Sequence, residues 1–293
     1  MQSMNEPPLD CAEGRLPSGD GPYIHVDTTL QIEQLKTPLR AEVVKRALAE
    51  YKFRSTSTYA RFEFNRTLLR DLAYLYVRAQ KARGLGDILG EINKAFTSRM
   101  ASRNRLARCL EVIQHFLDIR PGNLTPDLEL LRFREFLVYG MTQAHVAWGR
   151  SVHHEFNGTQ CARAEERPMR AANDNIIFSL PRCRPSKINC QIHHFYSSNS
   201  GRFKTLGDKI KALGDGASAQ MKRAAEVLNS AAENPKQLCD DRICAKIGDL
   251  LIAVDGLDLP RYGANNDEDW RPISEALGKL LVNPLRVPRR GEE

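Results

Sequence analysis

The 293-residue sequence has no apolar run of the roughly 18 residues that a membrane-spanning helix needs. Residues 1–22 are polar and rich in Pro and Gly, without the basic start and apolar core of a signal peptide, so we expect a flexible leader. Seven cysteines, an odd number with irregular spacing, argue against a disulfide framework and favour reduced thiols. These absences predict a cytoplasmic chain with no membrane partner.

The sequence also lacks several signatures of enzyme classes. It has no GxxxxGK[ST] phosphate loop, which argues against an NTPase. No Gly-rich elbow or orienting acid accompanies its Cys and His residues, so a Cys-His nucleophile has little support. It contains no internal repeat and no low-complexity tract.

The composition is that of a globular protein, with 42% hydrophobic and 27% charged residues. Lys and Arg number 43 against 36 Asp and Glu, which gives a formal net charge of +7. This modest basic excess allows a polyanionic partner such as nucleic acid. A merely soluble surface explains the same excess equally well.

Strands and helices alternate near the start of the chain. Residues 23–27 and 53–57 have the character of short strands, whereas 39–51 and 59–83 have helical spacing. This order is typical of a parallel α/β sheet. The last part recovers the pattern, with a helix expected over 244–254, a short strand over 259–264, a polar loop over 265–270 and a final helix over 273–282.

The middle of the chain differs from both ends. We expect helices over 87–120 and 127–148 and one or two more over 203–232, with polar sequence of no clear period over 149–175. The Cys- and His-bearing stretch 179–196 has a partly extended character. Segment 83–235 is therefore interpreted as a mainly helical insertion, and residues 284–293 as a basic tail.

Acidic residues follow the predicted strands at the positions where ligands bind in parallel sheets. Asp27 ends the first strand, Glu63 lies one turn into the helix after the second, and Asp249 is early in the penultimate helix. Asn266, Asp267 and Asp269 fall in the loop after the last short strand. Converging carboxylates repel one another unless a cation neutralises them, and hard oxygen ligands suit Mg²⁺ or Mn²⁺.

Each acid also has an ordinary structural explanation. Asp27 could cap the segment that begins at Thr28, and Glu63 could pair with Arg66 on a solvated helix face. Asp249 could be a plain exposed helix residue, and Asp267 could belong to a polar turn. Only the ordered set of residues favours a metal site.

Four segments carry a resemblance to the PIN-domain nucleases. VDTTLQIEQL resembles the family's first strand, which ends in Asp followed by Thr or Ser, and STSTYARFEF resembles its second strand and helix. KIGDLLIAVDG resembles the third motif, and YGANNDEDWRPI the last. The resemblance covers 23–82 and 236–283, with 83–235 as an insertion far longer than compact members carry.

The resemblance implies a parallel sheet flanked by helices and a metal-dependent nuclease, most often an endoribonuclease. Asp27, Glu63 and Asp249 would hold Mg²⁺ or Mn²⁺, and Asn266 would complete the site. Asn266, at the family's fourth position, keeps an oxygen but carries no charge, which weakens the case for a second metal; Asp267 could substitute.

Two further sets of residues are candidates for binding. The first would hold structural zinc, although its spacing is looser than a CxxC pair and buried thiols are the simpler explanation; it comprises Cys183, Cys190, His193 and Cys239. The second would track a phosphate backbone, although a solvated helix face explains it too; it comprises Arg99, Arg103, Arg105 and Arg108.

The sequence therefore predicts a nuclease that hydrolyses phosphodiester bonds in RNA or single-stranded DNA. One alternative is a catalytically inactive scaffold that binds nucleic acid or a protein, as the neutral Asn266 suggests. Another is the nuclease of a toxin–antitoxin or phage-defence pair, with an inhibitor protein as partner.

Overall fold

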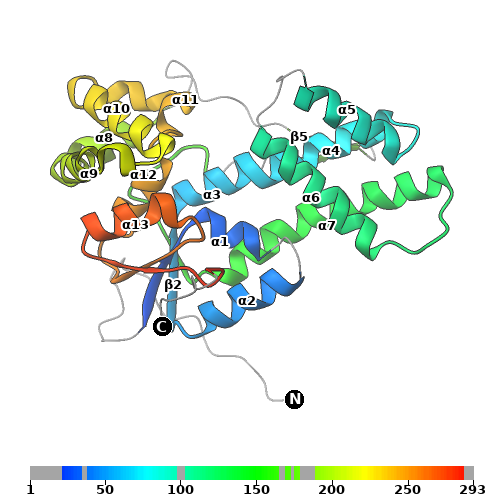
Figure 1. Ribbon diagram of the computed structural model, residues 1–293, viewed down its shortest axis with the longest axis horizontal. Helices are drawn as coiled ribbons and strands as arrows, with labels where there is room; N and C mark the ends of the chain where they lie inside the picture. The colour runs from blue at the N-terminus through cyan, green and yellow to red at the C-terminus, as the bar shows by residue number, and fades with distance from the viewer. Residues whose placement is uncertain are drawn as a thin grey trace.

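A five-stranded parallel sheet lies at the centre of the computed structural model, which describes residues 22–34, 38–97, 103–164, 169–172, 175–178 and 189–286. Figure 1 shows helices around this sheet. The strand order is β3-β2-β1-β6-β7, and all four neighbouring pairs are parallel. The predicted α/β class with a parallel sheet is confirmed. The strands are β1 (Tyr23–Val26), β2 (Phe53–Ser57), β3 (His154–Phe156), β6 (Arg261–Gly263) and β7 (Leu280–Val282).

The first half of the chain follows the predicted alternation of strands and helices. After β1 come α1 (Thr28–Glu33) and α2 (Pro38–Ala49), and after β2 comes a long helical run. This run consists of α3 (Thr58–Phe64), the π-helical turn η1 (Asn65–Leu69) and α4 (Arg70–Lys81). It corresponds to the helix predicted over 59–83. The π turn begins two residues after Glu63, and such turns are frequent at functional sites.

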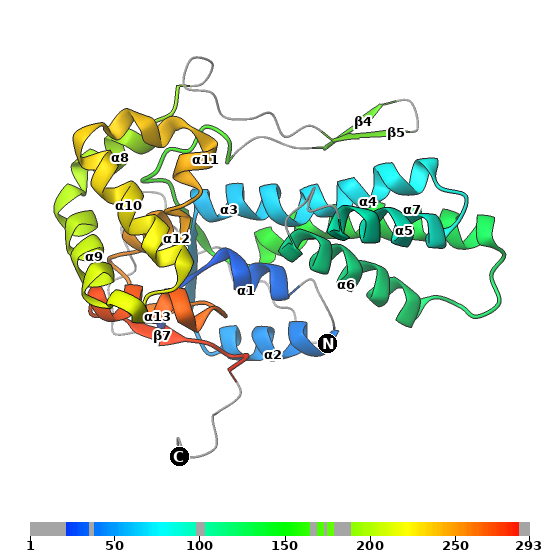
Figure 2. The same cartoon turned by 45° about the horizontal axis from the view of Figure 1, so that its top comes forward.

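Three helices extend from this run on the side of the molecule away from the C-terminal helices (Figure 2). They pack on α4 through an apolar cluster that includes Leu72, Leu106 and Phe133. Farther along the chain, β4 and β5 form a separate antiparallel pair. These elements are α5 (Leu85–Thr97), α6 (Arg103–Ile119), α7 (Pro126–Ser151), β4 (Met169–Ala172) and β5 (Asn175–Phe178).

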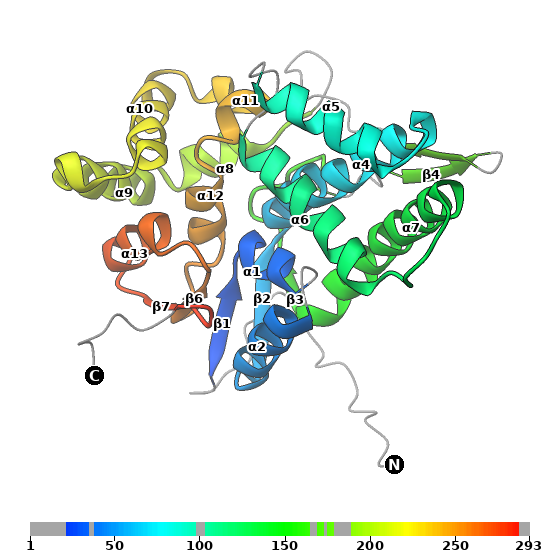
Figure 3. The same ribbon diagram turned by 45° about the vertical axis from the view of Figure 1, so that its right-hand side comes forward.

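The remaining helices gather on the opposite side, around α12 (Figure 3). Among the described residues, no helix is both long and apolar enough to cross a membrane. The elements are α8 (Ile192–Ser198), α9 (Ser200–Ala212), η2 (Gly214–Gly216), α10 (Ala219–Glu233), η3 (Pro235–Cys239), α11 (Asp241–Cys244), α12 (Gly248–Asp255) and α13 (Asp267–Ala276).

Apolar and polar contacts fix helices to both faces of the sheet. On one face, Ile24 and Val26 of β1 pack with Val44 and Leu48 of α2. On the other face, the Tyr262 hydroxyl of β6 donates to the Ala253 carbonyl of α12 at 2.7 Å. Helix α12 is thereby held beside the carboxyl ends of the central strands.

A second anchor places the C-terminal end of α12. The Asp255 carboxylate accepts hydrogen bonds from Ser57 Oγ at 2.5 Å and from the Gly158 backbone N–H at 2.9 Å. Ser57 ends β2 and caps α3, whereas Gly158 follows β3. One carboxylate thus ties α12 to the carboxyl ends of two strands.

Strand β3 lies within segment 83–235, where no strand was expected. It pairs with β2 through Ser55–His154, Thr56–Glu155 and Ser57–Phe156. It escapes detection because it has only three residues, all partly buried, and a strand of that length shows no alternation. The interpretation of 83–235 as an insertion stays a prediction, but this segment contributes an edge strand to the sheet.

The expected loop over 265–270 and helix over 273–282 are wrong. Helix α13 begins at Asp267 and ends at Ala276, and residues 280–282 form β7. Three acids in the first turn of α13 suit the positive end of the helix dipole, which explains why a polar segment begins this helix. Gly278, with φ of +66°, adopts the left-handed conformation that separates the helix from the strand.

Candidate metal centre

Asp27 stands directly after β1, where the backbone leaves the sheet. Its N–H donates to the Gly263 carbonyl at 2.8 Å, which continues the pairing with β6. Its Oδ2 caps α1 by accepting from the backbone N–H of Thr29 at 3.1 Å and from the Thr29 hydroxyl at 2.5 Å. Its Oδ1 is buried and accepts no hydrogen bond of normal geometry, although the Trp270 side chain acts to lower the pKa of this carboxyl. The capping explanation is therefore correct, but it occupies only one of the two oxygens.

Glu63 reaches the same edge from α3. Its Oε2 accepts from the Thr28 hydroxyl at 3.3 Å, so α1 and α3 both orient this carboxylate. The Thr28 hydroxyl also lies 3.2 Å from the Ala60 carbonyl, one turn before Glu63. Thr28 directly follows Asp27, so it connects the segment that carries Asp27 with the helix that carries Glu63.

Asp249 lies in the first turn of α12, the third element that contributes a carboxylate to this edge of the sheet. The residue before it, Gly248, lies so close to Glu63 that a Cβ at this position would overlap Glu63 Oε1. A side chain at this position would displace the Glu63 carboxylate, so glycine lets α12 begin beside α3 with Glu63 in place. Sequence reasoning missed this contact, because nothing in the sequence shows how closely two distant helices approach.

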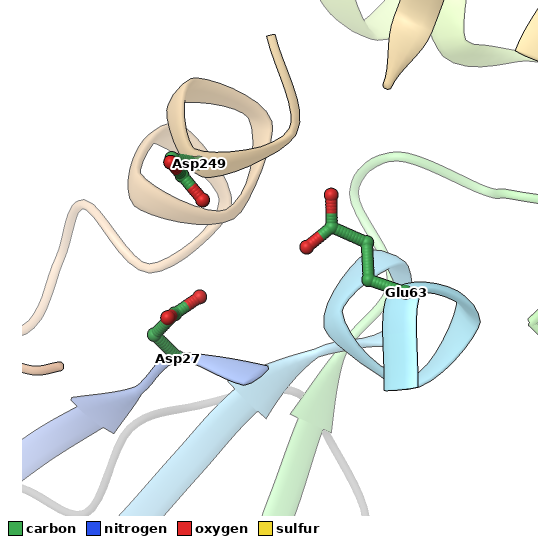
Figure 4. Close-up of side chains that lie close together, drawn as sticks. All are labelled: Asp27, Glu63 and Asp249. Atoms are coloured by element: carbon green, nitrogen blue, oxygen red, sulfur yellow. The ribbon is translucent and has the colours of Figure 1, made fainter. Parts of the chain in front are cut away.

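The three carboxylates converge in space (Figure 4). One ligand atom from each of Asp27, Glu63 and Asp249 lies within 4.8 Å of the others, a spacing that fits a single metal ion. Their positions in the chain span 222 residues, so the fold and not the local sequence brings them together. The predicted convergence of these three residues is confirmed.

The electrostatics of the cluster favour protonation or a cation. Burial, and then the charge of Asp27, raise the pKa of Glu63 to about 8. Burial, together with the charges of Asp27, Glu63 and Asp269, raises the pKa of Asp249 well above its usual value. Burial also raises the pKa of Asp27, against the hydrogen bonds from Thr29. The charge of Arg66 acts to lower the pKa of Glu63, but it offsets the negative charge of the cluster only in part.

A fourth acid, Asp269, lies near Asp249. The sequence analysis placed Asp269 in a loop, whereas it belongs to α13. It is 3% exposed, and its charge is among those that raise the pKa of Asp249. Its Oδ1 accepts from Ser218 Oγ at 2.5 Å, and its Oδ2 from Asn266 Nδ2 at 2.6 Å. The sequence analysis included Asp269 among the converging acids, but the first turn of α13, and not a loop, holds it there.

Asn266 and Asp267 do not join the carboxylate cluster. Asn266 directs its amide nitrogen to Asp269, so its contact with the site is indirect. Asp267 accepts from Asn283 Nδ2 at 2.8 Å and pairs with Arg271 at 3.0 Å. Although partial burial opposes the shift, the hydrogen bonds from Asn283 and Arg271 lower the pKa of Asp267. The predicted ligand role of Asp267 is wrong, because these partners already satisfy its charge.

Helix α10, from the middle of the chain, closes one side of the cluster. Ser218 caps this helix and also donates to Asp269, whereas Gln220 Nε2 donates to Asp249 Oδ2 at 2.9 Å. Both donors are neutral, so they orient the two acids without compensating their charge. Sequence reasoning assigned no role to Ser218 or Gln220.

The predicted phosphate-binding arginines divide into two groups. Arg99 lies outside the described residues, as does the side chain of Arg103. Arg105 Nε and Arg108 Nε donate to the buried Asp71 carboxylate at 3.0 and 2.8 Å. Neither arginine is a plain solvated surface charge, and their contact with nucleic acid stays a prediction.

The predicted zinc ligands are only partly described. Cys183 lies outside the described residues, and Cys239 Sγ lies 3.4 Å from His193 Nδ1. Burial raises the pKa of the Cys190 thiol to about 12, which favours an ordinary protonated thiol. Among the residues that the structure describes, the acidic cluster alone has the spacing of a metal site. Structural zinc stays a prediction.

Comparison of the chain with protein-family models, with curated proteins and with solved structures finds no match.

Proposed function

We propose that this protein is a divalent-metal-dependent nuclease of the PIN-like kind, and that its substrate is RNA or single-stranded DNA. The observation that carries the proposal is the convergence of Asp27, Glu63 and Asp249 within 4.8 Å at the carboxyl ends of parallel strands. This edge of a parallel sheet is the usual position of ligand sites. The ordered motifs that resemble the PIN family supply the same three acids.

The donor set fits a hard divalent cation. All three groups are carboxylates, and Asp27 Oδ1 is buried without a hydrogen-bond partner of normal geometry. An orphaned buried oxygen beside two further acids is costly unless a cation is present. Oxygen-only ligands suit Mg²⁺ or Mn²⁺ better than Zn²⁺, which favours nitrogen and sulfur.

The residues of this chain would position the substrate and its metal. Thr29, Thr28 and Gln220 each donate neutral hydrogen bonds to a different carboxylate, two from Thr29 and one from each of the others, and so fix its orientation. Burial of Asp27 keeps bulk water from the base of the site. Bound Mg²⁺ or Mn²⁺ would supply Lewis-acid stabilisation of charge on a phosphodiester oxygen and would lower the pKa of water.

A cleavage assay tests this proposal. The purified chain is incubated with labelled RNA and with single-stranded DNA of the same sequence, with Mn²⁺ or with EDTA. We expect metal-dependent cleavage that falls at least about a hundredfold in Asp27→Asn, because that variant removes charge from the cluster. Asp267→Asn is the matched control, since Asp267 is an acid of the same region whose partners are Arg271 and Asn283.

Two outcomes would contradict the proposal. Cleavage that persists in EDTA, or that Asp27→Asn leaves at full rate, would remove the assigned role of the cluster. Absence of cleavage in the wild type, with intact folding and saturable Mn²⁺ binding, would instead favour the inactive scaffold.

A further inference from the structure

The helical run that carries Glu63 continues into a cluster of arginines. Arg66 follows Glu63 by three residues and Arg70 by seven, with the π-helical turn η1 between Glu63 and Arg70. Arg70 is the first residue of α4, so both arginines follow Glu63 along the same helical run. The charge of Arg66 reaches the cluster, because it acts to lower the pKa of Glu63.

Helix α6 adds two more guanidinium groups to this row. Arg105 and Arg108 contact the Asp71 carboxylate at 3.0 and 2.7 Å, whereas Arg70 Nε lies 3.9 Å from it. Burial and the like charges of Arg105, Arg66 and Arg108 lower the pKa of Arg70. The basic row is defined here as Arg66, Arg70, Arg105 and Arg108.

The basic row holds more positive charge than the fold requires. Asp71 is buried, and hydrogen bonds from Arg105 and Arg108 satisfy one oxygen each. Arg70 Nε makes no hydrogen bond, although its side chain is only 38% exposed. The guanidinium groups of Arg70, Arg105 and Arg108 surround the single Asp71 carboxylate, which leaves a local excess of positive charge next to the acidic cluster. Such an excess is unfavourable without an anion and favourable with one.

The guanidinium groups are held in place before any ligand binds. Arg105 Cζ lies 4.5 Å from the centre of the Tyr74 ring, a cation–π distance, while its Nε bonds Asp71. Arginine forks of fixed orientation match phosphate oxygens better than mobile lysines do. A polyanion with regularly spaced phosphates fits a row of this kind better than a single small anion, which would engage only one end.

We propose that the basic row binds the sugar–phosphate backbone of a single-stranded nucleic acid and directs it to the acidic cluster. The inference rests on the proposed function for its choice of substrate, because the row begins beside Glu63. A single strand is favoured over a duplex, since Asp27 is 1% exposed and a flexible strand reaches a buried carboxylate more readily than a rigid helix.

Binding can be measured apart from cleavage. Fluorescence anisotropy in EDTA gives the affinity of the full chain for labelled single-stranded RNA and for DNA of the same sequence, over a range of salt concentrations. Arg66→Ala combined with Arg70→Ala should weaken binding at least about tenfold. It should also reduce the slope of log K against log salt by about 1.4, or about 0.7 for each lost phosphate contact.

The matched control removes the same charge elsewhere. Arg46 and Arg132 are exposed and each pairs with a glutamate on its own helix, so Arg46→Ala combined with Arg132→Ala should change the affinity less than about twofold. Arg66→Lys combined with Arg70→Lys retains the charge and should recover part of the affinity. Circular dichroism of each variant verifies folding, and Arg105 and Arg108 are left intact because Asp71 depends on them.

Several results would overturn the inference. One is that the Arg66/Arg70 variant and the wild type have the same affinity and the same salt slope. Another is that the wild type binds neither the RNA nor the DNA strand. A third is that the wild type binds an acidic polyglutamate peptide more tightly than the oligonucleotides. Failure of the nuclease proposal is read separately, from hydrolysis of bis(p-nitrophenyl) phosphate with Mn²⁺. We expect the Arg66/Arg70 variant to retain this activity, since so small a substrate does not reach the row.

Discussion

Two acidic residues on one continuous helical run have opposite surroundings. Glu63, on α3, faces Asp27 and Asp249, and its pKa rises to about 8 because of burial and the charge of Asp27. Asp71, eight residues later on α4, faces Arg105 and Arg108 at 3.0 and 2.7 Å. The fold thus supplies the counterions of one acid and adds further acids around the other.

The difference separates a structural acid from a ligand-binding one. A buried carboxylate with two guanidinium partners stabilises the packing of α4 on α6 and needs nothing from solution. Three carboxylates without such partners cost stability until a cation arrives. The comparison predicts opposite responses to the same chemical change at the two positions.

Replacement of each acid by its amide gives the largest expected effect. Asp71→Asn should lower the free energy of unfolding by about 3 kcal/mol, because it leaves Arg105 and Arg108 without their shared carboxylate. Glu63→Gln in EDTA should leave the free energy unchanged or raise it, since it relieves repulsion. Urea denaturation of both variants measures the difference. Equal destabilisation by the two changes would break the comparison.

The free energy of unfolding should also depend on pH, because burial and the charge of Asp27 raise the pKa of Glu63. This change in free energy should be smaller than the effect of Asp71→Asn. Glu63 keeps its proton in the folded state up to about pH 8, whereas the unfolded chain releases it near pH 4.5. Since the folded state then binds more protons, the free energy of unfolding falls as pH rises and levels off above about pH 8. Between pH 6.5 and 8.5 we expect a fall of about 1 kcal/mol in EDTA, reduced from the full value by partial solvent exposure.

The range above pH 6.5 avoids the titration of His25. Burial lowers the pKa of this histidine to about 3, so only the unfolded chain takes up its proton near pH 6.5, and stability there rises with pH. Glu63→Gln should lose most of the fall that the wild type shows between pH 6.5 and 8.5. The prediction fails if the two proteins have parallel pH profiles in denaturant titrations.

Gln220 gives the smallest expected effect. Removal of its hydrogen bond to Asp249 in Gln220→Ala should weaken Mn²⁺ binding about tenfold, because partners of this kind hold ligands in position. Isothermal titration calorimetry measures the affinity. Asn229→Ala, an exposed change on the same helix, is the control and should bind as the wild type does. Equal affinity for Gln220→Ala would show that α10 covers the cluster without orienting it.

The sequence was sufficient for the central strands and for three acids of the site. Strand β2 has the predicted bounds, and Asp27, Glu63 and Asp249 follow their strands or begin their helix as expected. These features depend on local patterns, namely the composition of short strands, a cap after β1 and helical periodicity. Ligand positions at the edge of a parallel sheet follow from the same topology.

Features that depend on contact between distant segments were not predictable. Asp71 meets Arg105 and Arg108 across 34 and 37 residues, and no periodicity reveals which charges face one another on packed helices. Strand β3 is too short to show alternation, and its place is set by pairing with β2. Asp269 was assigned to a loop because residues 265–270 are polar, whereas it lies in the first turn of α13.

A Mn²⁺ titration of stability tests the account most directly. The unfolding midpoint of the wild type and of Asp27→Asn is measured in EDTA and at increasing Mn²⁺. We predict saturable stabilisation of the wild type, because a ligand that binds only the folded state raises the free energy of unfolding with its concentration. Asp27→Asn should show little or none. An unchanged wild-type midpoint, or equal stabilisation of both proteins, would contradict the claim that Asp27, Glu63 and Asp249 share one cation.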